Sequence, residues 1–176
     1  MPVKVGTILS AITLSLSSVA PALAQTSIQS LANGNYRFCS NRPPSSVVSD
    51  EEILAAGHCF LFQKSGNQVV GYFWDMSTYG EVGACVTGTV NSNTVNGDAL
   101  EYIFDAEIPV DPRLKGARPV DWDNNGYLKV TSANATYNSD QGVVSTSIFY
   151  STAVLNLNEF YRYNAGTQSP PTSCQN

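Results

Sequence analysis

The fold is decided by two related stretches, Cys59-Phe-Leu-Phe-Gln-Lys-Ser-Gly66-Asn67-Gln-Val-Val-Gly71-Tyr72 and Cys85-Val-Thr-Gly-Thr-Val-Asn-Ser92-Asn93-Thr-Val-Asn-Gly97-Asp98. They align at a spacing of 26 residues, at which Cys, Asn, Val and Gly recur at matching positions. Each reads as a strand, a tight turn and a second strand, because Gly and Asn tolerate the positive φ that two-residue hairpin turns need. Two hairpins in series predict a four-stranded antiparallel meander.

Pairing the strands across these turns assigns their side chains to two faces, because alternate residues of a strand point to opposite sides. The predicted inner face is apolar and carries Phe60, Phe62, Val69, Phe73, Val86, Val90, Val95 and Ala99. The outer face is polar in the second hairpin, with Thr87, Thr89, Asn96 and Asp98. In the first hairpin the outer face carries Leu61, Val70, Tyr72 and Trp74, so another segment covers it or it is a contact surface.

Three glycines, at positions 71, 88 and 97, thin the predicted inner face. Glycine inside a strand marks a bend or a close approach of backbones. The sequence therefore predicts an all-β fold, in which the meander curls into a small antiparallel β-barrel or a strongly twisted sheet.

Other elements flank the meander. Strands are predicted over residues 35–39, 98–104, 126–133 and 143–155, and a helical turn or a strand end over 157–163. A short helix is predicted over 50–56, since Ser49 can cap it and Glu52 completes a capping box. The segment 106–125 contains three prolines and is expected to form a long surface loop.

The four cysteines, Cys39, Cys59, Cys85 and Cys174, are expected to form two disulfides, as in other exported chains with an even cysteine count. Cys39 and Cys59 fall on neighbouring predicted strands, whereas Cys59 and Cys85 fall two strands apart, about 9–10 Å. That separation is too long for a disulfide without bending. The spacing favours Cys39–Cys59, which leaves Cys85–Cys174 to hold the C-terminal segment.

Residues 1–24 are typical of a secretory signal peptide. Lys4 gives a positive start, an apolar stretch runs over 8–19, and Ala22-Leu-Ala24 offers the small residues that signal peptidase requires. We therefore expect residues 25–176 to form a single secreted or periplasmic β domain. No other run reaches about 18 apolar residues, so no transmembrane segment is expected in the mature chain.

The charge pattern limits the partners. The chain has 9 Lys and Arg residues, 14 Asp and Glu residues and a net charge of −5, with no run of like charge longer than the three acidic residues at 50–52. Nucleic acids and anionic membranes require clustered Lys and Arg, so nucleic acid is not expected as a partner. No cofactor is indicated, and the partner is expected to be a small molecule, a glycan or a protein.

A calcium loop is one candidate site. Residues 121–126 match the first six positions of the D-x-[DN]-x-[DN]-G pattern, with Asp121, Asp123 and Asn125 as the oxygen ligands. Ser132 stands where the twelfth position requires a bidentate Glu, and no helices flank the loop. The same residues are typical of an ordinary turn before a strand, and we expect a turn.

Catalytic chemistry has little support. His58, the single histidine, has no nucleophile motif near it, so it is expected to pack at the surface or in a loop. Glycosidases use paired carboxylates, and Asp98, Glu101, Asp105 and Glu107 are close in sequence. Glu101 shares the strand parity of the inner face, whereas Asp98 is expected to point outward.

Aromatic residues provide the other candidate site. Tyr72, Trp74 and Tyr79, together with Glu101, are candidate ligand-binding residues at the rim of the curled sheet. Such rings stack on sugars or close an apolar pocket. The alternative is that these rings belong to the core and its cover.

Three motifs carry a resemblance: Gly34-Asn-Tyr-Arg-Phe-Cys39, the pattern F-x-x-S-G-N-x-V-x-G-Y over 62–72, and Phe160-Tyr-Arg-Tyr-Asn164. Together they resemble a group of uncharacterised exported β-proteins of cyanobacteria over most of the mature chain. The resemblance implies a periplasmic or extracellular destination and carries no functional residues. The hairpins are also loosely similar to lipocalin-like and avidin-like barrels, although the Gly and Trp near the first strand of lipocalins are missing.

The sequence therefore favours an exported, non-enzymatic binding or envelope-associated module with an apolar interior. A glycan-acting hydrolase using Glu101 and the aromatic cluster is the first alternative. A structural or inhibitory protein that uses the apolar outer face of the first hairpin is the second.

Overall fold

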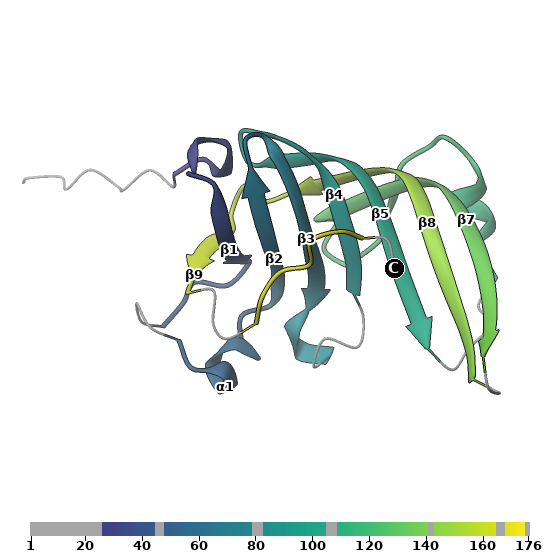
Figure 1. Ribbon diagram of the computed structural model, residues 1–176, viewed down its shortest axis with the longest axis horizontal. Helices are drawn as coiled ribbons and strands as arrows, with labels where there is room; N and C mark the ends of the chain where they lie inside the picture. Colours follow the sequence, from purple (N-terminus) through teal and green to yellow (C-terminus); the bar gives the residue numbers. More distant parts are fainter. Residues whose placement is uncertain are drawn as a thin grey trace, which may run out of the picture.

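The computed structural model describes residues 26–44, 48–78, 83–104, 109–140, 143–164 and 168–174. These residues form one antiparallel sheet of nine strands in the order β6-β7-β8-β5-β4-β3-β2-β1-β9 (Figure 1). The strands are β1 (Gly34–Cys39), β2 (His58–Ser65), β3 (Gln68–Asp75), β4 (Gly83–Asn91), β5 (Thr94–Phe104), β6 (Val120–Asp121), β7 (Leu128–Asp140), β8 (Val143–Asn156) and β9 (Tyr161–Tyr163). The helices are short: α1 (Asp50–Ile53) and the 3₁₀ turns η1 (Ile28–Ser30), η2 (Met76–Thr78) and η3 (Pro112–Lys115). The all-β prediction is confirmed, and the predicted signal peptide lies outside the described residues.

The meander β2–β5 has the predicted register. Phe60 pairs with Phe73 across the first turn, and Gly88 pairs with Gly97 across the second. Gly66 and Ser92 take positive φ angles of 59° and 56° in these turns. All eight predicted inner residues are buried and join one core with residues from β1, β7 and β8. Burial of each large side chain contributes about 1.5–3 kcal/mol, which fixes the register.

Glycines bend the sheet. A Cβ on Gly88 would lie 2.3 Å from the carbonyl oxygen of Asn96, and a Cβ on Gly97 would lie 1.9 Å from that of Thr87. The two backbones can approach so closely only because neither residue carries a side chain. A register shift between Gly97 and Ala99, where β5 meets β8, continues the bend, since bulges increase local twist.

The bend brings the two flanks of the sheet together. Tyr127, next to β7, and Phe160, next to β9, meet edge to face with their ring centroids 4.9 Å apart. Within the described ranges the edge strands β6 and β9 are not hydrogen-bonded to each other, so the sheet is open. The expectation of a curled sheet holds, and aromatic packing rather than a closed hydrogen-bond ladder joins its flanks.

A second, smaller core lies on the convex face. Helix α1 begins with the predicted capping box of Ser49 and Glu52. The segment that carries α1 covers the convex side of β2 and β3, where Leu61 and Trp74 are buried. The apolar outer face of the first hairpin is therefore only partly a surface: Val70 is half-buried and Tyr72 is 45% exposed.

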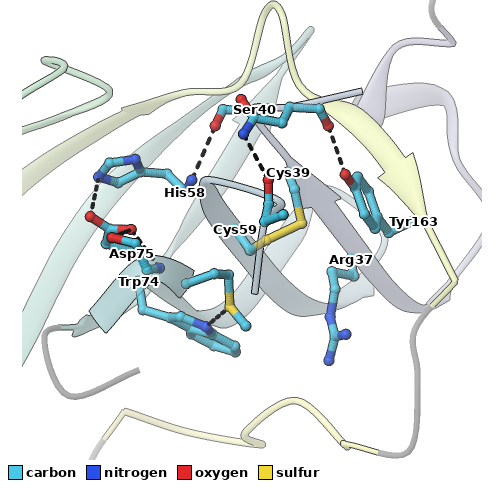
Figure 2. Close-up of a disulfide and its surroundings, with 12 residues drawn as sticks. Arg37, Cys39, Ser40, His58, Cys59, Trp74, Asp75 and Tyr163 are labelled. Carbon is cyan, nitrogen blue, oxygen red and sulfur yellow. Dashed lines mark hydrogen bonds and ion pairs between the residues drawn. A yellow bond between two sulfur atoms is a disulfide. The ribbon is translucent and has the colours of Figure 1, made fainter. Parts of the chain in front are cut away.

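The structure contains two disulfides, and their pairing is the one that the strand order favours. Cys39–Cys59 links β1 to β2 beside the smaller core (Figure 2). Cys85–Cys174 holds the C-terminal segment against the convex face, where it crosses the middle strands (Figure 1).

The segment between β5 and β7 differs in part from its prediction. It was expected to be a loop, but it contains η3 and the two-residue strand β6, which pairs with β7. Asp111 caps η3 by accepting a hydrogen bond from the backbone N–H of Arg113 at 2.8 Å. Local capping and one ladder step therefore order part of this proline-rich segment.

Replacing Gly97 with Ala is expected to destabilise the fold, because its Cβ would overlap the backbone of β4. We expect Gly97→Ala to lower the free energy of unfolding by about 1–3 kcal/mol in urea titrations. Gly116→Ala is the matched control, since the nearest atom to its Cβ would lie 4.0 Å away. Equal unfolding midpoints for the two variants would show that the backbones do not approach as described.

Candidate functional site

The residues predicted to form one ligand site are separated in the structure. Tyr72 lies exposed on the convex face, whereas Trp74 is buried on that face and donates its indole N–H to the Met76 sulfur. Glu101 faces the opposite, concave side, and Tyr79 lies outside the described residues. Tyr72 and Trp74 lie close together, with ring centroids 6.1 Å apart, but the sheet separates both rings from Glu101, so these three residues do not share one site.

Glu101 holds part of the interior together. Its Oε2 accepts hydrogen bonds from the Tyr150 hydroxyl at 2.5 Å and from the Trp122 indole N–H at 3.0 Å. Burial and the neighbouring Glu101 carboxylate raise the pKa of Tyr150, so its hydroxyl stays a donor. The Trp122 ring also meets Phe73 edge-on, with centroids 6.0 Å apart. Glu101 thus fastens the segment before β7 over the concave face.

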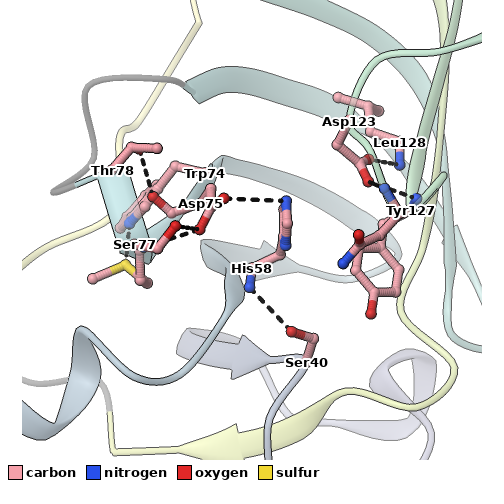
Figure 3. A network of polar contacts seen from close by, with 11 residues as sticks. Ser40, His58, Trp74, Asp75, Ser77, Thr78, Asp123, Tyr127 and Leu128 are labelled. Carbon is pink, nitrogen blue, oxygen red and sulfur yellow. Dashed lines mark hydrogen bonds and ion pairs between the residues drawn. The ribbon is translucent and has the colours of Figure 1, made fainter.

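His58 and Asp75 form a second polar contact on the same side (Figure 3). The imidazole Nε2 lies 3.9 Å from Asp75 Oδ2, and the ring packs between Phe73 and Tyr127. Burial opposes ionisation of Asp75, but hydrogen bonds from Ser77 and the charge of His58 lower its pKa overall.

No nucleophile meets the imidazole of His58 among the described contacts. Ser40 Oγ accepts its hydrogen bond from the backbone N–H of His58 at 3.0 Å, not from the ring. The arrangement is that of a packed histidine, but His58 is buried at the start of β2, whereas the sequence predicted it at the surface or in a loop.

The calcium-like loop is a turn held by its own carboxylates. Asp123 accepts hydrogen bonds from three backbone N–H groups, those of Asn125, Tyr127 and Leu128, at 2.7–3.2 Å. Asp121 pairs with Lys129 at 2.6 Å. The part of the chain that the structure describes contains no group of three or more His, Cys, Asp or Glu side chains that could hold a metal ion.

A groove of about 570 Å³ lies on the convex face, bounded on one side by the C-terminal segment. Its polar lining comes from Gln63, Ser65, Gln68, Thr87 and Asp98, and its apolar lining from Val70, Leu100 and Phe149; Val69, whose side chain lies in the main core, also borders it. Thr172, Ser173 and Cys174 complete it. Because Cys174 is bonded to Cys85, the disulfide fixes this wall of the groove.

Asp98 is the chemically distinctive residue of the groove. It is half-buried, and no hydrogen bond or ion pair from the described residues reaches its carboxylate. Burial alone raises its pKa. Phe149 also lines the groove and is 43% exposed although it is large and apolar. An unpaired carboxylate and an exposed aromatic ring in one groove are typical of a ligand site rather than of a solvated sheet face.

The strand pattern correctly predicts Asp98 and Thr87 on the outer face. It does not predict that both residues line a groove. The groove was missed because its wall comes from residues 172–174, whose path depends on the Cys85–Cys174 disulfide. One available signal was Asp98 itself, since aspartate is depleted in strands and here lies inside β5.

Comparison with known proteins gives no match to a family model, to a curated protein or to a solved structure. The resemblance to exported cyanobacterial proteins therefore stays a prediction. Among the described residues, no helix is long and apolar enough to cross a membrane.

Replacing Asp98 with Asn is expected to stabilise the protein at neutral pH. Because the folded-state pKa of Asp98 is raised, its ionisation increasingly opposes folding as the pH rises above the unfolded-state pKa, and the full penalty is present above the folded-state pKa. We expect Asp98→Asn to raise the free energy of unfolding at pH 7 by less than about 1 kcal/mol, because solvent screens the charge. The gain should vanish below about pH 3.9, where an ordinary Asp is protonated.

Asp111→Asn is the control for this pH series. Hydrogen bonds from Arg113 lower the pKa of Asp111, so its removal should give no gain at pH 7. A gain for Asp98→Asn that persists unchanged at pH 3, or its absence at pH 7, would contradict the assignment.

Proposed function

We propose that the chain is an exported, non-enzymatic binding module whose ligand occupies the groove on its convex face. The observation that carries this proposal is the half-buried, unpaired Asp98 carboxylate inside the 570 Å³ groove. Small-molecule sites have volumes of about 300–1,000 Å³ and combine apolar walls with a few polar groups. Export is supported by the signal-peptide pattern and by two disulfides.

The concave face is a less suitable ligand site. Phe60, Phe62 and Phe73 are fully buried there and pack with residues from both flanks of the sheet. The curled sheet then serves as a rigid scaffold, and its core holds in register the five strands that line the groove. Rigid elements position binding residues more accurately than loops do.

The two alternative functions lose part of their basis. A retaining or inverting glycosidase needs two carboxylates about 5–9.5 Å apart in one cleft, whereas Glu101 is engaged by Tyr150 and Trp122. An interaction protein that uses the apolar outer face would need Leu61 and Trp74 exposed, and both are buried. The groove remains the feature that these contacts leave open.

Binding is tested by NMR titration of the disulfide-bonded mature chain, residues 25–176, with neutral oligosaccharides, short peptides and small organic cations. The ligand should shift the amide signals of Thr87, Asp98, Leu100 and Phe149, which line the groove. Val70→Trp should abolish those shifts, because the indole would fill the groove.

Asn91→Trp is the matched control, since Asn91 is exposed on β4 and does not line the groove. It should leave binding unchanged. Shifts confined to concave residues such as Glu101 and Tyr150, or no shift with any of the three compound classes, would contradict the proposal.

A further inference from the structure

We infer that the groove binds a cationic group, an ammonium or a guanidinium carried on an aliphatic chain, with Asp98 as its counter-ion. This inference rests on the proposed function and adds the chemical class of the ligand. Among the described residues that line the groove, Asp98 is the one charged side chain.

Asp98 occupies an unusual position in strand β5. It lies between Gly97 and Ala99, where the pairing of β5 with β8 shifts register and two residues of β8, Ser151 and Thr152, oppose it. The pairing of β5 with β4 stays regular there, with Asp98 opposite Thr87 on the convex face. Bulges are common next to functional sites. A charged residue at the centre of an eleven-residue interior strand violates strand propensity, and such violations concentrate at functional sites.

Within the described ranges, no Lys, Arg or His side chain forms an ion pair with this carboxylate. Lys64 of β2 lies on the opposite, concave face, where it is buried and donates to the carbonyl oxygens of Leu31 and Gly66. The chain as a whole is acidic, with a net charge of −5. An anionic ligand would be repelled at Asp98, and a neutral ligand would leave the half-buried charge unpaired.

The remaining lining suits the body of such a ligand. Val70 and Leu100 offer apolar contacts to methylene groups, and the exposed Phe149 ring can face a cation within the range of cation–π attraction. Side-chain oxygens of Gln63 and Thr87 can accept the N–H donors that the carboxylate does not reach. Such a cation can come from a free amine or from an arginine or lysine side chain of a peptide.

The test compares butylguanidinium with butylurea, its neutral counterpart of nearly equal shape, by NMR titration of the mature chain. We expect butylguanidinium to bind at least about tenfold more tightly, as for one charge-assisted pair. Asp98→Asn should remove this preference, whereas Asp111→Asn, which changes a carboxylate outside the groove, should retain it.

A second pair of probes distinguishes the source of the cation: acetyl-Ala-Ala-Arg-Ala-Ala-amide and the same peptide with citrulline. Tighter binding of the arginine peptide than of butylguanidinium would identify a peptide side chain as the source of the cation. Equal binding would identify a free small cation. Equal affinity for butylguanidinium and butylurea, or binding of cellobiose with neither cation bound, would overturn the inference while leaving the groove a binding site. If cellobiose, the peptides and the cations all leave the groove residues unshifted, the proposed function fails as well.

Discussion

The close approach of two backbones at Gly88 and Gly97 is the constraint on which the rest of the structure depends. Neither position has room for a Cβ, so β4 and β5 can lie as they do only with glycine at both. The bend at these residues turns a long meander into a curled sheet with a concave and a convex side. Without it, residues near β7 and β9 would lie at opposite ends of the sheet instead of in contact.

The curl gives the two faces different roles. The concave face gathers side chains from both flanks into the main core, and the hydrogen bonds to Glu101 fasten the segment before β7 across it. On the convex face the curl brings no described residues of the flanks together, so two separate segments cover parts of it. One is the segment carrying α1, and the other is the C-terminal segment held by Cys85–Cys174. The groove lies between the C-terminal segment and the sheet.

Much of this fold follows from local patterns in the sequence. The 26-residue spacing predicts the register of β2–β5, since a shift of one residue would expose Phe60 and Val95. The capping box at Ser49 and the pairing of the four cysteines follow from spacing and strand order in the same way. These features depend on residues that are close in sequence or are paired on adjacent strands.

The features that sequence reasoning missed depend on where a long connection runs. Trp122 reaches Glu101 only because the segment 109–127 crosses the concave side, and no local pattern specifies that path. Trp74 is buried because the α1 segment folds over it, whereas its neighbour Tyr72 on the same face stays exposed. The open edge of the sheet likewise reflects how far the curl proceeds, which strand patterns leave undetermined.

Aromatic contacts across the curl test the central claim most directly. In a flat sheet β3 and β6 would lie five strand spacings apart, about 24 Å, whereas the Phe73 and Trp122 rings lie 6.0 Å apart in the curled one. A NOESY spectrum of residues 25–176 should show cross-peaks between Phe73 and Trp122 and between Tyr127 and Phe160. Cross-peaks from the Phe73 ring to β2 and β4 alone, with none to Trp122, would contradict the account.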